Sequence, residues 1–362
     1  MIISLSLHSV LSMCRALAFI SKTSEQMTIK GEATVVKHTG SHYLLSQLPG
    51  WDLFPAVLRG KIRLKGSTAT NPVAVGDKVV FEAEVPAEAV GNEGEVLLLD
   101  GSRVGMDSLN LENPAAITSV AARKNYIIRK STNLSRQSHI IAANLDRAFI
   151  IATIDFPEIK LPFLDRILVT CEVYNVPVTI VLNKVDLYRE SHKEMLEAFH
   201  EIYEGAGYPI IEVSALTGEG VDQLREACSG HVSLFSGVSG VGKSSLIKAL
   251  DPSLDPRVGE ISEAHVQGKH TTTFYEMYAL ESGGFIVDTP GLRGFGLVDL
   301  KKEEIALYFP EMLKASEDCR FTPCTHTHEP GCAVKEAVEN GEISYERYSS
   351  YLGMLDEEGK YR

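Results

Sequence analysis

The stretch GVSGVGKSS, residues 237–245, decides the fold of the central part of this chain. It matches the pattern G-x-x-x-x-G-K-[ST] and lies between a β-rich run, HVSLFS, and a helical run, SLIKAL, as a phosphate-binding loop (P-loop) requires. In such a loop the backbone amides surround phosphate oxygens, Lys243 reaches the β and γ phosphates, and Ser244 can hold Mg2+. We therefore expect nucleotide contacts from Gly237, Val238, Ser239, Gly240, Val241, Gly242, Lys243, Ser244 and Ser245.

A second motif, FIVDTPG, ends a buried strand downstream of this loop. Asp288 is placed to bind Mg2+ through water, and the Gly291 amide is placed to sense the γ phosphate. Between the two motifs lies GKHTTT, residues 268–273, in which Thr271 or Thr272 is expected to complete the Mg2+ shell when a triphosphate is bound. The alternative interpretation of this threonine run is a solvated loop.

The nucleotide base is read by NKVD, residues 183–186, at the end of the strand PVTIVLN. The Asp186 carboxylate can accept hydrogen bonds from N1–H and N2–H2 of guanine, whereas adenine offers no such pair of donors. The motif favours GTP, because an ATPase would require Asp186 to point away from the base. Ser214-Ala215-Leu216 resembles the loop whose backbone amide contacts the guanine carbonyl. Contacts on the base side are expected from Asn183, Lys184, Val185, Asp186, Ser214 and Ala215.

The order of these motifs narrows the fold. In the familiar GTPase layout the P-loop comes first, whereas here NKVD and SAL precede it and DTPG comes last. The order indicates a circularly permuted catalytic domain, which can keep its contacts because chain termini often lie close together. Apolar runs alternate with helix-like segments from about residue 121 onward, which predicts a parallel sheet with helices on both faces.

Residues 28–100 read as short strands separated by Gly and Pro, a pattern that suggests a small antiparallel barrel. In LRGKIRLK the apolar residues alternate with cations, so a period of two places four of them on one strand face: Arg59, Lys61, Arg63 and Lys65. Such a face suits a phosphate backbone, as on oligonucleotide-binding barrels. The alternative is a solvated outer face.

The charge of the chain is uneven. The whole sequence has 35 basic and 48 acidic residues, a net charge of -13, which taken alone argues against nucleic-acid binding. Residues 28–81 hold seven basic and three acidic residues, a local charge of +4, whereas residues 294–362 hold eight basic and fourteen acidic residues, a local charge of -6. The net charge therefore conceals a basic N-terminal part and an acidic C-terminal part.

The segment CRFTPCTHTHEPGC, residues 319–332, has the composition of a metal site. Three thiolates and one imidazole satisfy tetrahedral Zn2+, and a closed set of four ligands is structural rather than catalytic. His326 and His328 compete for the imidazole position, and spacing alone does not exclude either; the alternative to a metal site is a group of buried reduced cysteines. Six cysteines in 362 residues are too few for a disulfide scaffold, which points to a reducing compartment.

The basic barrel, the permuted GTPase and the cysteine cluster together resemble the RsgA family of small ribosomal subunit biogenesis GTPases. The resemblance covers about residues 27–362, and its most specific marks are GVSGVGKSS after NKVD, GKHTTT, DTPGLRGFG and CRFTPCTHTHEPGCAV. It implies an OB-fold barrel, GTP/GDP with Mg2+, hydrolysis stimulated by the small (30S) subunit, and a role in the late maturation of that subunit and its rRNA. It also implies one structural Zn2+ on Cys319, Cys324, His326 and Cys332, which selects His326 over His328.

The expected architecture is a multidomain α/β protein. Four segments are predicted: a disordered or mis-assigned extension at 1–26, an RNA-binding OB-fold β-barrel at 27–105, a circularly permuted P-loop GTPase domain at 120–297, and a mainly helical zinc-binding domain at 298–362. A secretory signal is disfavoured, because no basic residue precedes Arg15 and the chain offers no convincing small-x-small cleavage site. The longest uncharged apolar tract is too short for a membrane span. We therefore expect a cytoplasmic protein with no membrane association, and a monomer.

One position carries a mechanistic expectation. After Asp288-x-x-Gly291 many GTPases have a glutamine that orients the attacking water, whereas this chain has Leu292, which can neither donate nor accept a hydrogen bond. Intrinsic hydrolysis is therefore expected to be slow. His270 is the candidate for the missing group, beside Lys243 and Asp288 in the catalytic set; a ribosomal group could replace it, and His270 would then face phosphate or solvent.

Two functional hypotheses of different classes fit these motifs. The first is a GTP phosphohydrolase that acts as a molecular switch on the small subunit and leaves after hydrolysis. The second is a nucleotide-gated RNA-binding checkpoint module whose turnover is incidental. A Ser244→Ala variant separates them, because a switch would be trapped on the particle while a binding module would behave almost normally. A permuted GTPase of the large subunit is disfavoured by the barrel in front and the zinc cluster behind.

Overall fold

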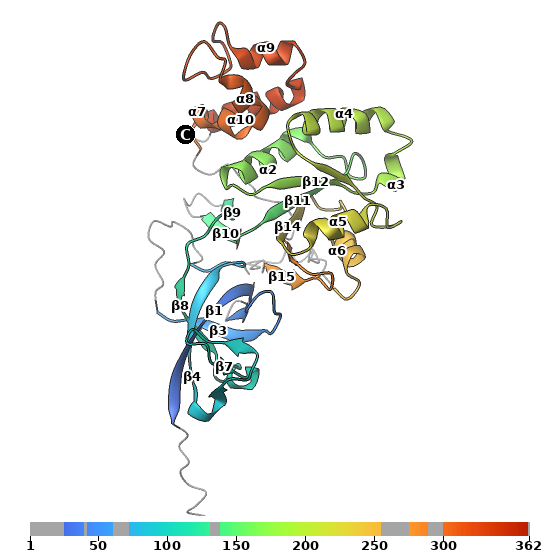
Figure 1. Ribbon diagram of the computed structural model, residues 1–362. Helices are drawn as coiled ribbons and strands as arrows, with labels where there is room; N and C mark the ends of the chain where they lie inside the picture. The colour runs from blue at the N-terminus through green and yellow to red at the C-terminus, as the bar shows by residue number, and fades with distance from the viewer. Residues whose placement is uncertain are drawn as a thin grey trace, which may run out of the picture.

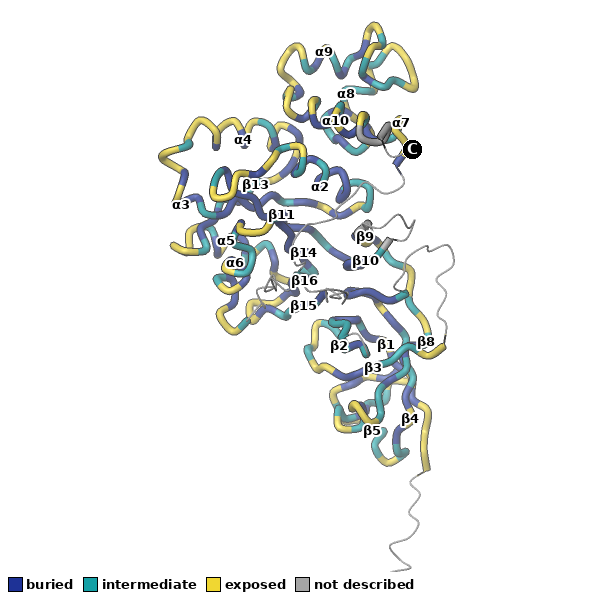
Figure 2. Tube along the Cα trace, turned by 180° about the vertical axis from the view of Figure 1, so that it is seen from behind, coloured by how far each residue is buried: buried dark blue, intermediate teal, exposed yellow. Residues whose placement is uncertain are grey.

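The computed structural model describes residues 25–39, 42–60, 72–130, 138–254, 275–288 and 300–360. They form three bodies in a row: a β-barrel at the lower end, an open sheet flanked by helices in the middle, and a small group of helices at the upper end (Figure 1). Buried residues follow the strands of the first two bodies, and exposed residues lie along the outer side of the flanking helices (Figure 2).

The barrel closes on itself through five strands. In spatial order these are β1 (Gln26–His38), β2 (Tyr43–Ser46), β3 (Phe54–Leu58), β8 (Ala115–Val120) and β4 (Lys78–Pro86), with β4 pairing back onto β1. All of these pairings are antiparallel except that of β3 with β8, and this closed order is the one expected of an OB-fold. The rings of Phe54 and Phe81 meet edge to face, 5.1 Å apart, in the fully buried core.

One detail of the barrel differs from the sequence expectations, and another falls outside the described residues. The domain boundary predicted at residue 105 leaves out β8, because the polar stretch before this strand reads as the end of a domain. β3 ends at Leu58, and Lys61, Arg63 and Lys65 lie outside the described residues, so the predicted row of four cations is not tested. Arg59 is described, and it pairs with Glu82 at 2.9 Å. A small sheet of β5 (Val90–Gly91), β7 (Arg103–Val104) and β6 (Val96–Leu97) packs beside the barrel.

The central sheet has the predicted parallel arrangement. Its order is β13 (Ile210–Glu212), β12 (Val178–Leu182), β11 (Arg147–Ala152), β14 (Val232–Gly237), β16 (Phe285–Asp288) and β15 (Glu276–Ala279), of which only β15 runs antiparallel to its neighbour in this sheet. The parallel strands are apolar along their length because both faces are covered. β11 and β12, for example, place Ile150 beside Ile180, both fully buried.

Helices cover both faces of this sheet, as predicted. The helices are α2 (Leu161–Val173) and α4 (Lys193–Gly205) on one face and α5 (Val221–Cys228) and α6 (Lys243–Leu250) on the other, with the short α3 (Val185–Tyr188) following β12. In α4 the buried residues Leu196, Phe199 and Tyr203 recur at helical spacing, so one side of the helix packs on the sheet.

The barrel and the central sheet are joined edge to edge. β1 pairs with β15 at Lys37 and Glu276, whose side chains form an ion pair of 2.5 Å, so one continuous sheet runs through both bodies. Trp51 packs on Phe285 with ring centroids 5.6 Å apart. The hairpin of β9 (Tyr126–Lys130) and β10 (Ser138–Ala143) lies between the two bodies (Figure 1).

The upper body consists of helices. They are α7 (Lys302–Ile305), α8 (Pro310–Ser316), α9 (Ala333–Glu339) and α10 (Tyr345–Lys360). Phe309, Met312 and Tyr351 form part of its core, and Val169 of α2 belongs to the same hydrophobic cluster. The helical body is therefore seated on α2 of the central domain. Over the described ranges, no helix combines the length and the apolar character needed to cross a bilayer.

Candidate functional site

The P-loop connects the end of β14 to the start of α6. Gly240 and Gly242 have φ angles of 89° and 88°, a left-handed backbone that residues with a side chain rarely adopt. A Cβ atom on Gly242 would lie 2.5 Å from Nδ2 of Asn183. The backbone turn therefore favours glycine at both positions, and the close approach of NKVD, the base-reading motif, requires it at Gly242.

Hydrogen bonds tie the base-reading motif to the P-loop. Asn183 is buried; its Nδ2 donates to the carbonyl of Val241 at 2.8 Å, and its Oδ1 accepts from the backbone N–H of Ala215 at 3.1 Å. Lys184 Nζ donates to the carbonyl of Gly240 at 2.7 Å. Hydrogen bonds thus hold together three segments that are separate in the sequence, NKVD, SAL and the P-loop, as a nucleotide site requires.

The side chains of these three segments divide into those that face the core and those that face solvent. Val185 and Val241 are fully buried in two hydrophobic clusters, so they offer only backbone groups to a ligand. Ser214 is also buried, and its hydroxyl accepts from the N–H of Thr217 at 3.1 Å. Asp186 is exposed in the first turn of α3, which leaves its carboxylate accessible to a base.

Lys243 and Asp288 meet at the carboxyl ends of β14 and β16. Their side chains form an ion pair, and each is close to nine-tenths buried. The two predicted phosphate and Mg2+ groups are therefore neighbours, at the end of a parallel sheet where ligands of such folds bind. Of the other predicted residues on this side, His270, Thr271, Thr272 and Gly291 lie outside the described residues, as does Leu292.

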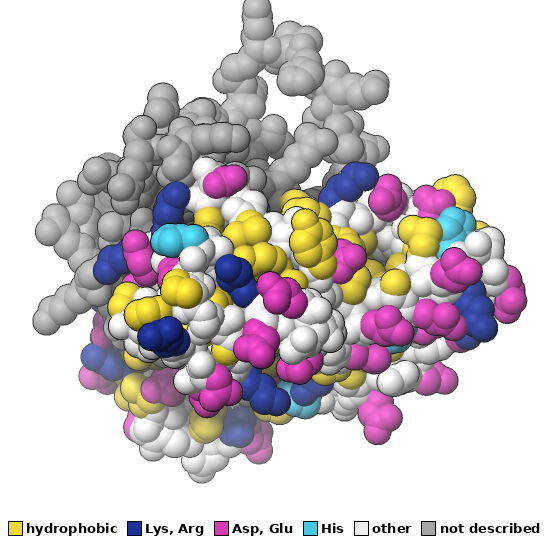
Figure 3. Space-filling view, turned by 90° about the horizontal axis from the view of Figure 1, so that it is seen from above, with side chains coloured by type: hydrophobic (Ala, Val, Ile, Leu, Met, Phe, Trp, Pro, Cys, Tyr) yellow, Lys and Arg dark blue, Asp and Glu magenta, His cyan; other side chains and the backbone are white. Residues whose placement is uncertain are grey.

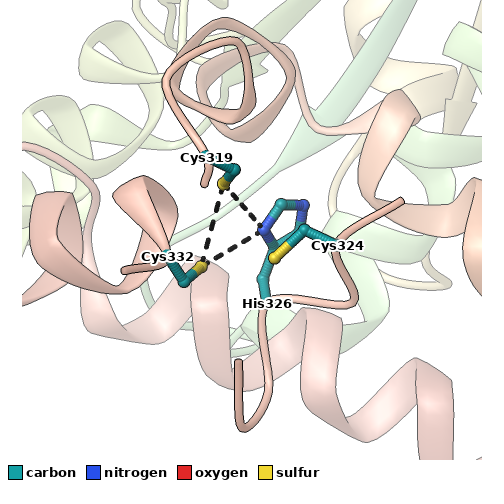
Figure 4. A group of neighbouring side chains, drawn as sticks. All are labelled: Cys319, Cys324, His326 and Cys332. Carbon is teal, nitrogen blue, oxygen red and sulfur yellow. Dashed lines mark hydrogen bonds between the residues drawn. The ribbon is translucent and has the colours of Figure 1, made fainter. Parts of the chain in front are cut away.

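The four residues predicted to hold zinc come together between α8 and α9. The ligand atoms of Cys319, Cys324, His326 and Cys332 all lie within 4.8 Å of one another (Figure 4). The Sγ atoms of Cys319 and Cys332 are 4.0 Å apart, and His326 Nδ1 is 3.7 and 3.4 Å from them. A tetrahedral Zn2+ places sulfur pairs roughly 3.8 Å and sulfur–nitrogen pairs roughly 3.5 Å apart, so the group fits this ion.

The loop around these residues places His326, rather than His328, beside the cysteines. His326 is buried with a left-handed φ of 55°, and burial lowers its pKa, which favours the neutral imidazole that ligates metals. His328 is exposed, and its Nδ1 lies 2.9 Å from the hydroxyl of Thr327 instead. Tyr348 donates its hydroxyl to the carbonyl of His326 at 2.6 Å, so α10 helps to hold the loop.

One segment that contacts the base-reading motif gave no signal in the sequence. Lys184 Nζ donates to a second carbonyl, that of Phe156, at 2.5 Å. Phe156 follows β11, has a φ angle of 61° and is 57% exposed. A phenylalanine followed by a proline gives no local signal of a binding segment, because its role depends on where β11 lies beside β12 and β14. Only the sheet order could have identified it.

Comparison with known proteins agrees with this arrangement. The RsgA GTPase family model matches residues 120–298. The small ribosomal subunit biogenesis GTPase RsgA of Bacteroides fragilis is 48% identical over 91% of this chain and 98% of its own length, and that of Christiangramia forsetii is 42% identical over the same shares. The crystal structure of YjeQ from Thermotoga maritima superposes with a TM-score of 0.70 at 31% identity, over 92% of this chain and all of that one. YloQ, described as a circularly permuted GTPase, matches with a TM-score of 0.65 at 23% identity, over 94% and 98% of the two chains.

Proposed function

The chain belongs to the RsgA family of GTPases, and we propose that it hydrolyses GTP during the late maturation of the small (30S) ribosomal subunit. Binding to this subunit is proposed to stimulate the hydrolysis of GTP. The observation that carries the proposal is the contact between the base-reading motif and the P-loop. Asn183 of that motif donates to the carbonyl of Val241 in the P-loop and accepts from the N–H of Ala215 in the SAL segment. Such a pocket suits a guanine nucleotide in a cytoplasmic assembly factor.

Each part of the pocket has a proposed role toward GTP. Asp186 accepts hydrogen bonds from the guanine edge, and the backbone of Ser214 and Ala215 contacts the guanine carbonyl. The P-loop amides and Lys243 bind the phosphates. Mg2+, when bound, would neutralise phosphate charge, and Ser244 and Asp288 are the residues proposed to hold it, with Thr271 or Thr272 and the amide of Gly291 completing the γ-phosphate side.

The cysteine group is proposed to hold one structural Zn2+. Its four ligands leave no coordination position for a substrate, so the ion would stabilise the helical body rather than take part in catalysis. We expect about one zinc per chain by atomic absorption. Chelation should loosen α8 and α9 in hydrogen exchange and leave the central sheet protected.

The barrel is the proposed contact with rRNA. Residues 28–81 of the barrel have a local charge of +4, which suits a phosphate backbone, whereas residues 82–120 hold one basic and eight acidic residues. At the opposite end of the molecule, acidic side chains are spread among the cations (Figure 3), in keeping with the excess of acidic residues after residue 294. We therefore infer that residues 28–81, rather than the whole barrel, contact RNA. We also propose that the protein acts as a monomer. The proposed domains remain 27–105, 120–297 and 298–362, with β8 added to the first.

The proposed catalytic set is His270, Lys243 and Asp288. Leu292 stands where many GTPases have a water-orienting glutamine, so slow intrinsic turnover and dependence on the subunit are expected. A His270→Ala variant should still bind GTP but lose the stimulated turnover. Undiminished stimulation would assign the missing group to the subunit instead.

The test is GTP hydrolysis by the purified protein with and without small subunits, at fixed salt because RNA contacts depend on salt. Strong stimulation supports three parts of the proposal together: that the nucleotide is a guanine nucleotide, that the chain alone lacks a water-orienting glutamine, and that the small subunit is the partner. Tight GTP binding without stimulation would favour the alternative, an RNA-binding checkpoint module whose turnover is incidental. Absence of guanine nucleotide binding would overturn the proposal.

A further inference from the structure

The bend at residues 153–157, which follows β11, contacts Lys184 of the base-reading motif through its backbone. Lys184 has a long side chain with three N–H donors, and two of them are used by the carbonyls of Phe156 and Gly240, at 2.5 and 2.7 Å. One of these carbonyls belongs to the P-loop and the other to the bend. The ammonium group is therefore held from two sides, which restricts a side chain that would otherwise lose much rotamer freedom on binding a ligand.

The conformation of Phe156 is unusual and is not explained by packing of its ring. Its φ angle of 61° is a left-handed backbone, which is rare for a bulky residue. The residue is 57% exposed, so it does not gain the burial that would offset the strain. What the bend does achieve is to direct the carbonyl of Phe156 at Lys184. Strain of this kind persists where the surrounding contacts fix it, and it gathers at functional sites.

Contacts on both sides of Phe156 hold this bend in place. Asp155 Oδ1 accepts the backbone N–H of Phe156 at 2.7 Å, and Thr153 donates its hydroxyl to the carbonyl of Pro157 at 2.5 Å. The second carboxylate oxygen of Asp155 lies 3.5 Å from Nε2 of His192, the residue before α4. Asp155 is thus bonded directly to the strained residue and also anchored to a helix.

We propose that Asp155 is a positioning residue for guanine nucleotide binding: it holds Phe156 in the left-handed bend whose carbonyl, together with that of Gly240, fixes the ammonium group of Lys184. The inference rests on the proposed function, because Lys184 belongs to the base-reading motif. Asp155 touches neither the P-loop nor the base-reading motif among the hydrogen bonds of the described residues. Its effect therefore passes through Phe156 and Lys184.

The experiment is a double-mutant cycle on the dissociation rate of fluorescent GDP from the full chain. Asp155→Ala should speed dissociation by about tenfold, since one hydrogen bond and the geometry it fixes are lost. Asp155→Asn should stay within about twofold of the wild type, because its amide oxygen still accepts the N–H of Phe156. Glu158→Ala, which removes an exposed carboxylate of the same loop, is the matched control and should also stay within about twofold.

The decisive arm is Asp155→Ala combined with Lys184→Ala. If Asp155 acts through Lys184, the double variant dissociates no faster than Lys184→Ala alone, to within about twofold. The proposal would be overturned if the fold-changes of the two single variants in GDP dissociation rate multiplied in the double variant. It would also be overturned if GDP left Asp155→Asn as fast as it leaves Asp155→Ala. A wild-type chain that does not bind GDP would overturn the proposed function and this inference together, whereas normal wild-type binding with multiplying effects overturns this inference alone.

Discussion

The guanidinium group of Arg347 on α10 lies 2.7 Å from the carboxylate of Asp165 on α2, and both side chains are buried. Arg347 also reaches Glu311 on α8, with Nε and Nη2 at 2.8 and 3.1 Å from the two carboxylate oxygens. The ring of Phe309 lies against it, 4.6 Å from the guanidinium carbon. One arginine therefore joins the helical body to the central domain through two acidic partners.

Arg347→Met should destabilise the protein by about 3–5 kcal/mol, because it leaves two carboxylates buried without a cation. Arg347→Lys should recover only part of this loss, since an ammonium group lacks the fork that reaches both partners. Denaturant unfolding followed by circular dichroism gives the difference. The exposed Arg189, which pairs with Glu212, is the matched control, and Arg189→Met should cost less than about 1 kcal/mol. Equal losses at Arg347 and Arg189 would contradict the role of burial.

Glu329→Gln should weaken zinc binding by about 10–100-fold, because Glu329 shapes the loop that carries His326. One carboxylate oxygen accepts from the N–H and hydroxyl of Thr325, at 2.8 and 2.5 Å, and the other accepts from the N–H of Thr327 at 3.1 Å. A glutamine replaces one of these acceptors with a donor. Competition with a chelator of known affinity measures the effect, and Glu339→Gln, an exposed change on α9, should leave zinc affinity unaltered. An unaltered zinc affinity in Glu329→Gln would show that the four ligand residues keep their geometry without Glu329.

Gly242→Ala should abolish guanine nucleotide binding, because its Cβ would collide with Asn183 and its φ is left-handed. Gly207 has a similar φ of 94°, but no atom lies within 4 Å of the point that a Cβ would occupy there, so Gly207→Ala isolates the backbone strain. We expect Gly207→Ala to cost about 1–2 kcal/mol of stability and to retain nucleotide binding. Calorimetric titration with GDP distinguishes the two variants. Binding by Gly242→Ala at wild-type affinity would mean that the Asn183 contact is dispensable.

Acid should destabilise the protein partly through Asp146. Burial alone would raise the pKa of Asp146, but hydrogen bonds from Lys124, at 2.6 Å, and from the N–H of Val232, at 2.8 Å, outweigh it and leave the pKa lowered. A lowered folded-state pKa contributes stability above the unfolded value of about 3.9, and this stability is lost as pH falls through the folded pKa.

Asp146→Asn should therefore lower the melting temperature near pH 7, by an amount equivalent to about 1 kcal/mol because the pair is partly exposed. The gap to the wild type should close as pH falls below about 4. Melting curves between pH 3 and 7 test this, and Asp107→Asn, an exposed change in the barrel, should follow the wild type throughout. A gap that does not depend on pH would assign the effect to packing rather than to charge.

The nucleotide motifs could be predicted because each is a short run whose spacing and flanking pattern have a direct chemical meaning. The zinc ligands were predictable for the same reason. The pairing of Lys37 with Glu276 could not be predicted, since these residues are 239 positions apart and neither strand has a sequence feature that identifies the other as its partner. Arg347 and Asp165 look in the sequence like ordinary surface charges, and only the packing of α10 on α2 buries them. Short motifs therefore do not predict long-range strand pairing or buried ion pairs.

The strand order also sets the order in which the pocket is completed during synthesis. A chain leaves the ribosomal tunnel from its N-terminus, so β11, β12 and β13 emerge before β14. β14 then pairs with the free edge of β11, and β16 pairs with β14 only later. The base-reading half of the pocket is therefore exposed to the cell before the phosphate-binding half exists. The edge of β1 likewise waits for β15, the strand that follows residue 275. A nascent chain of this protein cannot engage nucleotide until most of its length has been translated.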